Sequence, residues 1–463
     1  MGYESFFSLV KESANFFLSW DKEKPVRVVS HYDADGISSA AILSFLLEHL
    51  NRKYVLTIVN QLTKPKLEEL KNEPYDYFIF ADLGSSLIKD VGNSFDRSKQ
   101  VIVLDHHQTE KEVHFENVMH VNPLLCDVGE DEISGSGVSF FFAKEIDNRV
   151  NKFAHLALVG MLGDLQDSSI GSLNSLVVDA AKKSGRVAVK KGLKLFGAQT
   201  KPLHKLLERS TNPYIPKVTG SESGAIQFLL ELGINPKNEK GWKRLVDLSQ
   251  EELQKLIAGI VIKRSSEENP EDVIGDIFIL EDAPVGSPFR DLREFATLLN
   301  ACGKMNKGYI GVCACLGYEK YKKEALSVLE AYRRELVSSL KWVENNFELE
   351  KTDGSLIIDG GDNISSNLIG VVVSIISKSV LKDCFVLGLA NTDDGMIKVS
   401  IRGPGNRNAN LKELLLRAIN LVGGGEVGGH ENAAGAFINV EQKERFIEIM
   451  DELLRKIAIE EKI

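Results

Sequence analysis

The ten residues VIVLDHHQTE, Val101–Glu110, decide how this chain of 463 residues is organised. Val101–Leu104 is an uninterrupted β-branched and aliphatic run, which predicts a strand buried on both faces of a parallel sheet. Directly after it come an acid and two imidazoles, Asp105, His106 and His107. Ligands of open α/β sheets bind beyond the carboxyl ends of the strands, so we expect a ligand site here. Two adjacent histidines are usually just solvated, so the interpretation depends on matching chemistry at other strand ends.

Composition restricts the class of protein. A hydrophobic content of 43% and a charged content of 26% are typical of globular proteins, and the length predicts two or three domains. No apolar stretch of about 18 residues is present, so we expect no membrane partner. An acid and a lysine come too early for a signal peptide, which favours a cytoplasmic protein. Five scattered cysteines exclude a disulfide framework.

The net charge argues against one kind of nucleic-acid-binding protein and allows another. A net charge of −10 argues against a protein that coats nucleic acid non-specifically, but it allows a local basic groove. Residues 182–217 contain ten Lys or Arg residues and one acid, Glu208. This run is either a set of solvated helix faces, a track for phosphates or a docking face for an acidic partner.

The first part of the chain alternates strand and helix patterns, which predicts an α/β fold with a parallel sheet. The expected strands are 26–30, 54–60, 77–81, 101–104 and 120–122, and the expected helices are 4–20, 37–50, 65–71, 138–147 and 152–162.

The alternation stops after this part. Residues 190–270 read as helices separated by turns and predict a helical insertion. Strand patterns at 274–280 and 309–316, with a helix at 292–300 between them, predict that the first domain resumes. A charged amphipathic helix then links to a second, smaller α/β unit. We therefore expect a first domain in two parts, at 1–189 and 271–317, with an insertion at 190–270 between them. A linker helix at 318–345 and a C-terminal domain at 346–463 follow.

Polar side chains follow two more strands of the predicted sheet and end one helix. His31, Asp33 and Asp35 follow the strand 26–30, Asp82 follows 77–81, and Asp164 follows the helix 152–162. Carboxyl ends of parallel strands share one edge, so these groups should meet His106 there.

So many carboxylates repel one another unless cations neutralise them. Carboxylate and imidazole ligands suit Mn²⁺ or Mg²⁺, and the motifs contain no cysteine for a thiolate site. Two such ions about 3.5–4 Å apart can share a hydroxide and clamp a phosphoryl group.

Two glycine-rich stretches are candidate anion sites. Ser134–Gly137 precedes a helix, whose exposed N–H groups can meet an anion, although an ordinary N-cap explains it equally well. Gly423–His430 is rich in glycine, whose backbone can approach a phosphate closely, and a flexible connection is the alternative.

In their order, HYDADG, ADLG, LDHH and GDLQD resemble the four motifs of the DHH phosphoesterase superfamily. GGGEVGGHENAAG resembles the signature of the DHH-associated C-terminal domain found in RecJ nucleases and nanoRNases. The resemblance covers residues 25–170 and 350–440, and 290–317 in part. The insertion and the long helix are most similar to archaeal RecJ-like proteins, including the GINS-associated nuclease.

The resemblance implies roles for these residues. One metal would be held by His31, Asp33 and Asp82, and a second by Asp35, Asp82, His106 and Asp164. His107 would contact the scissile phosphate, and Asp105 would fix an imidazole tautomer. Phosphate or nucleic acid would be bound on the C-terminal domain by Arg402, Gly428, Gly429 and His430. Bacterial RecJ commonly has an acid where His31 stands, and its oligonucleotide-binding domain has no evident counterpart here.

Three functions follow from this resemblance. The leading one is a single-strand exonuclease with two Mn²⁺ (or Mg²⁺) ions, acting on DNA (or RNA) 5′ to 3′ in replication or repair, and carried by GINS. The second is a phosphodiesterase for short oligonucleotides or cyclic dinucleotides. The third is a replisome scaffold, like the RecJ-related eukaryotic helicase subunit that has lost its metal ligands. Every ligand position is filled in this sequence, which argues against a purely structural role.

Overall fold

The computed structural model describes residues 2–110, 113–167, 170–210, 213–239, 241–267, 269–347, 355–379, 384–403 and 409–460. The chain forms two compact units, Met1–Leu329 and Glu330–Ile463. Their boundary falls inside the helix α13, Glu319–Asn346, which is close to the linker helix expected from the sequence. None of the helices described is both long and apolar enough to cross a bilayer.

The first unit contains a five-stranded sheet in the order β2-β1-β3-β4-β5. Every pairing in it is parallel, as the sequence predicts, so the carboxyl ends of the strands share one edge. The strands are Val26–His31 (β1), Tyr54–Val59 (β2), Tyr77–Ala81 (β3), Gln100–Leu104 (β4) and Val118–Val121 (β5).

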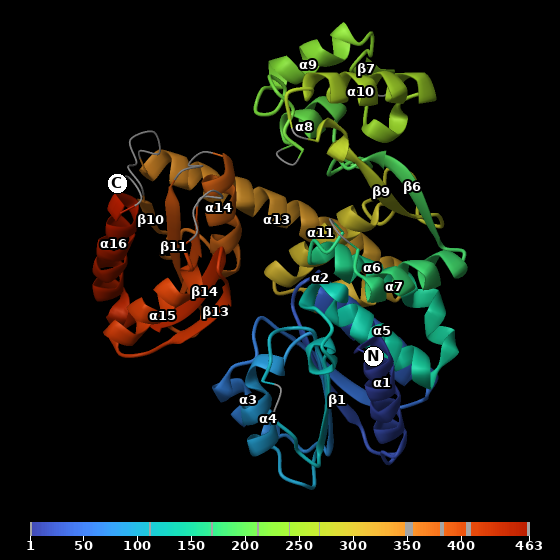
Figure 1. The fold of residues 1–463 in the computed structure, drawn as a ribbon, viewed down its shortest axis with the longest axis vertical. Helices are drawn as coiled ribbons and strands as arrows, with labels where there is room; N and C mark the ends of the chain where they lie inside the picture. Colours follow the sequence, from blue (N-terminus) through green and yellow to red (C-terminus); the bar gives the residue numbers. More distant parts are fainter. Residues whose placement is uncertain are drawn as a thin grey trace. The chain divides into compact units, whose positions relative to one another are not determined.

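Helices cover both faces of this sheet (Figure 1). On one face α3 (Lys64–Lys71) and α4 (Ile88–Ser94) pack on buried side chains that include Phe78, Phe80 and Val103. On the other lie α1 (Gly2–Leu18), α2 (Ala34–His49) and α5 (Gly135–Ile146). All residues of α2 from Ala34 to Leu47 are buried, because α6 (Ala154–Gly163), α11 (Leu292–Lys304) and α12 (Gly308–Cys315) also pack on it.

The inserted region is a separate group of short helices (Figure 1) and has its own hydrophobic core. The core joins α8 (Leu203–Glu208), α9 (Glu222–Glu231) and α10 (Gln250–Lys263). The helix α7 (Ser172–Lys183) precedes the region. The strand β6 (Val187–Leu193) leads into it and β9 (Ile274–Leu280) leads out of it, and these two strands pair antiparallel. The helical insertion expected from the sequence is confirmed, but the expected lack of strands in it is wrong, since β6 runs into it and β7 (Lys237–Asn238) pairs with β8 (Gly241–Trp242).

The expected strand at 309–316 is also wrong, because these residues form the helix α12. A short apolar run such as YIGVCACLG does not distinguish a buried strand from a buried helix. Cys315 is buried in this helix and Cys313 is half-buried. Among the described strands, β9 pairs with β6 and not with the five-stranded sheet, so residues 271–317 add no strand to that sheet.

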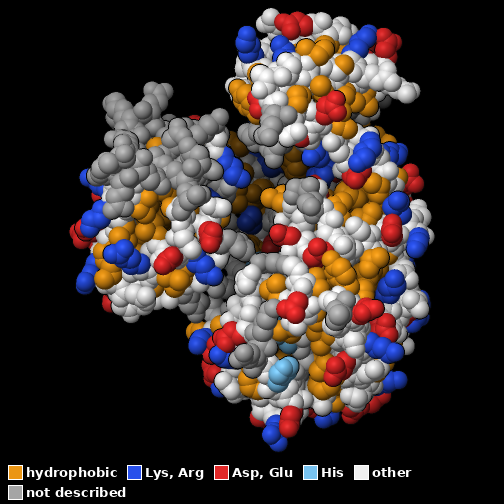
Figure 2. Space-filling view, in the orientation of Figure 1, with side chains coloured by type: hydrophobic (Ala, Val, Ile, Leu, Met, Phe, Trp, Pro, Cys, Tyr) orange, Lys and Arg blue, Asp and Glu red, His pale blue; other side chains and the backbone are white. Residues whose placement is uncertain are grey.

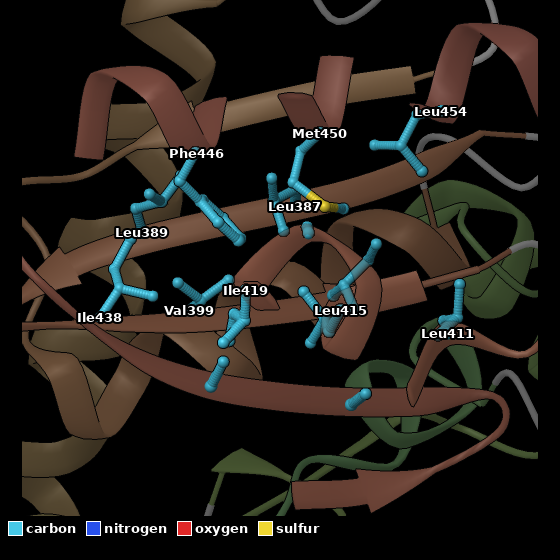
Figure 3. Packing of buried hydrophobic residues seen from close by; sticks show 14 of the residues in the cluster. Leu387, Leu389, Val399, Leu411, Leu415, Ile419, Ile438, Phe446, Met450 and Leu454 are labelled. Atoms are coloured by element: carbon cyan, nitrogen blue, oxygen red, sulfur yellow. The ribbon is translucent and has the colours of Figure 1, made fainter. Parts of the chain in front are cut away.

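The second unit contains a mixed sheet in the order β10-β11-β12-β14-β13. Its strands are Ser355–Asp359 (β10), Phe385–Asn391 (β11), Met396–Arg402 (β12), Glu426–His430 (β13) and Ala433–Asn439 (β14). One face packs on α14 (Ser366–Ser379) and the end of α13. The other packs on α15 (Leu411–Val422) and α16 (Lys443–Glu460), with Phe446 and Leu415 among the buried side chains (Figure 3).

The glycine-rich stretch, expected to be a loop, is largely the edge strand β13. Gly423 and Gly424 have positive φ at the end of α15 and turn the chain into this strand. A Cβ at Gly429, whose φ is +110°, would lie 2.4 Å from the carbonyl oxygen of Ala433. Glycine is therefore required where β13 approaches β14. The sequence pattern alone did not distinguish glycines needed for close strand pairing from glycines of a ligand-binding loop.

Candidate metal centre

The carboxyl edge of the parallel sheet brings together all the acids and histidines that the sequence places at its strand ends. His31 ends β1, Asp33 is the N-cap of α2, and Asp35 lies in the first turn of α2. Asp82 follows β3, and the three residues 105–107 follow β4. Asp164 is the C-cap of α6 and so arrives from a helix rather than from the sheet.

Three overlapping groups of side chains have ligand atoms within 4.8 Å of one another. The groups are His31 with Asp33 and Asp82, Asp35 with His106 and Asp164, and Asp82 with His106 and His107. Asp82 connects them, because Oδ2 lies 3.5 Å from Nδ1 of His31 and Oδ1 lies 3.5 Å from Nε2 of His106. The expected bridging carboxylate thus lies between the two expected ligand sets.

Backbone donors hold Asp35 in place. Its Oδ2 accepts from the N–H of Gly135 at 2.6 Å, and its Oδ1 accepts from the N–H of Ser136 at 3.0 Å. The anion at the Ser134–Gly137 segment is therefore a carboxylate of the protein itself. A Cβ at Gly135 would lie 2.5 Å from Asp82, and one at Gly160 would lie 1.9 Å from Asp35. Both glycines are needed for this approach, and no pattern in the sequence signals the role of Gly160.

The cluster contains buried polar atoms with no hydrogen-bond partner among the described residues. They are both carboxylate oxygens of Asp82, Nδ1 of His31 and both ring nitrogens of His106. Buried polar groups without partners are costly, and ionised ones far more so. Asp82 also has a φ of +58°. A divalent cation would satisfy these atoms, so the donor set fits the ions expected from the sequence.

The pKa values of the cluster also indicate that it requires a cation. Burial and the adjacent charge of Asp82 raise the pKa of Asp35 to about 7. Burial and the Asp35 carboxylate likewise raise the pKa of Asp164 well above its usual value. Although burial opposes the charged form, the Asp82 carboxylate, whose Oδ1 lies 3.5 Å from Nε2, raises the pKa of His106 to about 10. The cluster thus favours protons on Asp35 and Asp164, which offset the crowding of negative charge.

Asp105 and His107 form an ion pair beside the cluster. Oδ1 of Asp105 lies 2.7 Å from Nδ1 of His107 and also accepts the N–H of His106 at 2.8 Å, while Oδ2 accepts the N–H of Ser85. Burial opposes ionisation, but the His107 charge outweighs it and holds the pKa of Asp105 well below its usual range. Asp105 therefore fixes the orientation of the His107 ring, whose side chain is 42% exposed.

Two supporting side chains carry no signal in the sequence. Asn122 donates to the carbonyl oxygen of His107 and to Oγ of Ser85, both at 2.9 Å. Oγ of Ser85 also lies 2.8 Å from Nε2 of His120. These contacts tie the segment after β4 to β5. Ser and Asn between elements are too common in sequences to indicate such a role.

On the second unit, Arg402 ends β12 and is half-buried. Its guanidinium donates to the carbonyl oxygen of Ile401 at 2.8 Å, and burial lowers its pKa. Ala433 pairs with both Arg402 and His430, so the two candidate residues share one register position of the sheet. Gly428 and Gly429 precede His430 in β13. The side chain of His430 is outside the part of the chain that is described.

Three of the ten basic residues of the segment 182–217 form ion pairs with nearby acids. Arg186 pairs with Asp282, Lys191 with Asp276, and Lys205 with Glu208 and Glu222. Side chains of both charges are visible across the inserted region (Figure 2). This arrangement favours the interpretation of solvated faces over that of an unbroken phosphate track.

Three family models match the chain. The model of the DHH family N-terminal domain matches residues 25–161, and that of the DHHA1 domain matches 353–456. The model of the DHH-CID domain matches residues 195–278, within the inserted region. The matches show a DHH domain followed by a DHHA1 domain, and the chain is similar to DHH-family phosphoesterases of the RecJ type.

Two relatives show the extent of the similarity. An uncharacterized protein of Methanocaldococcus jannaschii is 29% identical over 438 residues, which are 93% of each chain. The single-stranded-DNA-specific exonuclease RecJ of Bacillus subtilis is 22% identical over 453 residues, covering 94% of this chain. The match spans only 46% of that RecJ.

Solved structures show the same fold. RecJ from Thermus thermophilus in complex with Mn²⁺ aligns with a TM-score of 0.60 and 17% identity, over 97% of this chain and 55% of that one. CDC45 from Entamoeba histolytica aligns with a TM-score of 0.62 and 12% identity, over 98% of both chains. At these identities the likeness concerns the fold alone.

Proposed function

We propose that this protein is a metal-dependent exonuclease that hydrolyses phosphodiester bonds of single-stranded DNA from the 5′ end. The observation that carries this proposal is the pair of ligand sets joined through Asp82, whose two buried oxygens have no other partner among the described residues. The similarity to a single-stranded-DNA-specific exonuclease, RecJ, supports the substrate, and the direction is proposed from the resemblance of the four motifs.

The ligand sets support two divalent ions, Mn²⁺ or Mg²⁺. His31, Asp33 and Asp82 would hold one ion, and Asp35, Asp82, His106 and Asp164 the other. Two bound ions supply an activated water and neutralise charge on the phosphoryl oxygens. The protein contributes fixed positions, because backbone N–H groups orient Asp35 and the α2 helix orients Asp33.

His107 is the residue we assign to the scissile phosphate. Asp105 accepts from Nδ1 of its ring and leaves Nε2 as the atom that can donate to a phosphate oxygen. Burial opposes the charged ring, but Asp105 overcomes this and raises the pKa of His107 to about 9, so the donor is protonated at neutral pH. Arg402, with Gly428, Gly429 and His430, would bind the strand on the DHHA1 domain.

The direct test uses single strands labelled separately at each end, with DNA and RNA of the same sequence, in Mn²⁺ and in Mg²⁺. We expect mononucleotides from the 5′ end of DNA and none with Asp82→Ala. Release from the 3′ end would contradict the direction, and preference for RNA would contradict the substrate.

A ladder of strand lengths separates this activity from that of a small-nucleotide phosphodiesterase. An exonuclease that contacts several phosphates should show kcat/KM rising over the first several nucleotides and then levelling off. Salt should weaken binding of long strands more than that of dinucleotides, because more counterions are released. If dinucleotides are the best substrate at both salt concentrations, the second function replaces the first.

We further propose that the inserted region docks a replication partner, with the GINS complex as the candidate. The region has its own buried core, and its described residues include no member of the metal ligand sets. Leu193 of β6 pairs with Ile274 of β9, so a two-residue Asn-Gly turn can join them and close a β-hairpin. The shortened protein should retain measurable cleavage of short strands, at a reduced rate, but fail to co-purify with GINS. Retained GINS binding would move the docking surface elsewhere.

A further inference from the structure

An apolar side chain lies exposed directly beside the candidate metal centre. Leu165 follows Asp164, is 75% exposed, and has a φ of +59°. The N–H of Gln166 bonds to the carbonyl oxygen of Met161, so Leu165 occupies the position after the C-cap of α6 where helices usually have glycine. Folding alone would favour glycine at this site, because leucine gains little burial and adopts an unfavourable backbone conformation.

Phe196 forms a second exposed apolar surface at the same place. Its side chain is 43% exposed, and Nζ of Lys201 lies 4.6 Å from its ring centroid. Leu165 and Phe196 both line a hollow of about 140 Å³ between the end of α6 and the helix α11. Large side chains left exposed beside a reaction centre are typical of a contact surface for a ligand.

The polar lining of this hollow suits an uncharged ligand. Arg293 is paired with Asp167, through Nε at 2.9 Å, so its charge is already neutralised. Oδ1 of Asn300 accepts the N–H of Ala34 at 2.9 Å, which leaves its amide N–H₂ for another partner. The described lining offers apolar surface, a hydroxyl from Thr297 and an amide, and its one cation is this paired arginine.

The hollow is adjacent to the ligand sets on two sides. Leu165 is bonded to Asp164 in the chain, and Asn300 holds Ala34, which lies between Asp33 and Asp35. A group bound in the hollow is therefore next to a phosphate held at the centre.

We propose that Leu165 and Phe196 form a contact surface for one nucleobase of the strand, beside the phosphate that is hydrolysed. This inference rests on the proposed function, since it assumes a polynucleotide at the metal centre. Apolar and aromatic side chains hold unstacked bases in a way that tolerates any sequence, because every base has a flat face. Binding energy from the base would be used to position the phosphate, so both residues are positioning residues.

The test measures kcat/KM on strands that lack a single base at each of the first three positions from either end. In the natural protein, base removal at one position should lower kcat/KM by about 5- to 150-fold, the range measured for stacking of one base on an aromatic side chain. Removal at the other positions should matter less.

Leu165→Gly and Phe196→Ala should lower kcat/KM on the intact strand and abolish the difference between intact and base-free strands at that position. Leu165→Gly relieves the left-handed backbone, so its unfolding temperature should not fall and a loss cannot be ascribed to misfolding. Phe196→Tyr should retain activity. Leu230→Ala, which truncates a leucine 58% exposed on α9, is the matched control and should leave kcat/KM unchanged.

The inference is overturned if base removal has the same effect at every position, or if both variants still distinguish intact from base-free strands. In either case cleavage by the natural protein, and its loss in Asp82→Ala, would leave the proposed function standing. Failure of the natural protein to cleave any strand would overturn both.

Discussion

The two five-stranded sheets of this protein place their polar residues in different ways. The first is parallel throughout, so every strand ends at the same edge, where β1, β3 and β4 deliver acids and imidazoles. The second mixes directions, with β11, β12, β14 and β13 antiparallel in turn. Its strand ends are divided between two edges, and the candidate residues Arg402 and His430 align through pairing with Ala433 instead.

The difference shows how topology concentrates charge. The parallel edge collects carboxylates that repel one another, which raises the pKa of Asp35 and of Asp164 and creates a need for cations. In the mixed sheet the basic residue Arg402 pairs with two neutral residues, Val386 and Ala433, which suits an anionic ligand. We therefore expect metal-dependent effects from changes in the first sheet and strand-binding effects from changes in the second.

The largest effect should come from Asp82→Ala, because both ligand sets lose a member. Loss of a residue that merely supports a metal ligand costs roughly 10- to 100-fold in activity or affinity, so loss of a shared ligand should cost more. Hydrolysis rates with saturating Mn²⁺ and the Mn²⁺-induced rise in unfolding temperature should both be lost. Asp179→Ala, an exposed acid on α7, is the control. Near-normal turnover of Asp82→Ala would contradict the shared-ligand assignment.

The next effect is the dependence of Mn²⁺ affinity on pH. His106, with a pKa of about 10, must release a proton to bind metal throughout the neutral range. Asp35, with a pKa of about 7, is ionised above this pH and must release a proton only below it. The affinity should therefore fall at least tenfold per pH unit from pH 9 to 7, because His31 and Asp164, whose pKa values are also raised, add to the protons released, and more steeply below pH 7. Calorimetric titration in buffers of different ionisation enthalpy measures the protons released. An affinity independent of pH would contradict metal binding by these residues.

A smaller effect is expected from Arg402→Ala in the second sheet. A hydrogen bond to a charged group contributes about 1.5–3 kcal/mol, so strand binding should weaken by about tenfold or more. Mn²⁺ binding should be unchanged, since Arg402 belongs to neither ligand set. Arg455→Ala, an exposed arginine on α16, controls for loss of net charge. If Arg402→Ala weakens Mn²⁺ binding, the division of roles between the sheets is wrong.

The smallest effect concerns salt. If Arg402 neutralises one phosphate, the slope of log affinity against log salt should fall in magnitude by about 0.7 for a single strand in Arg402→Ala. Leu165→Gly removes no charge and should leave the slope unchanged. Binding isotherms from 50 to about 200 mM salt, the range over which such slopes are read, measure both. An unchanged slope in Arg402→Ala would mean that Arg402 acts without contacting a phosphate.

Some predictions from the sequence depended on patterns that are local to one element. The run Val101–Leu104 is too short and too apolar for anything but a buried element, and flanking turns made it a strand. The parallel sheet was confirmed, and with it the shared edge that brings His31, Asp82 and His106 together. The roles assigned to these residues stay predictions.

Other predictions failed because the deciding contacts are distant in the sequence. The run at 309–316 is a helix since it packs against α2 and α11, and its apolar residues fit a strand equally well. Gly428 and Gly429 lie in the edge strand β13 and not in a loop, because they allow close pairing with β14, while their assigned contact with a phosphate stays a prediction.

By itself the sequence determined which residue types end each strand, because hydrophobic runs and the polar residues after them are written in chain order. Only the tertiary structure decided what those residues meet. The carboxylate of Asp35 accepts hydrogen bonds from the backbone N–H groups of Gly135 and Ser136, a hundred residues later. The space for this carboxylate depends on the absence of a side chain at Gly160. The exposure of Leu165 likewise follows from a helix cap and the surrounding helices, not from its own neighbours in the sequence. Burial depends on the packing of distant segments, and the local pattern of a sequence does not contain that information.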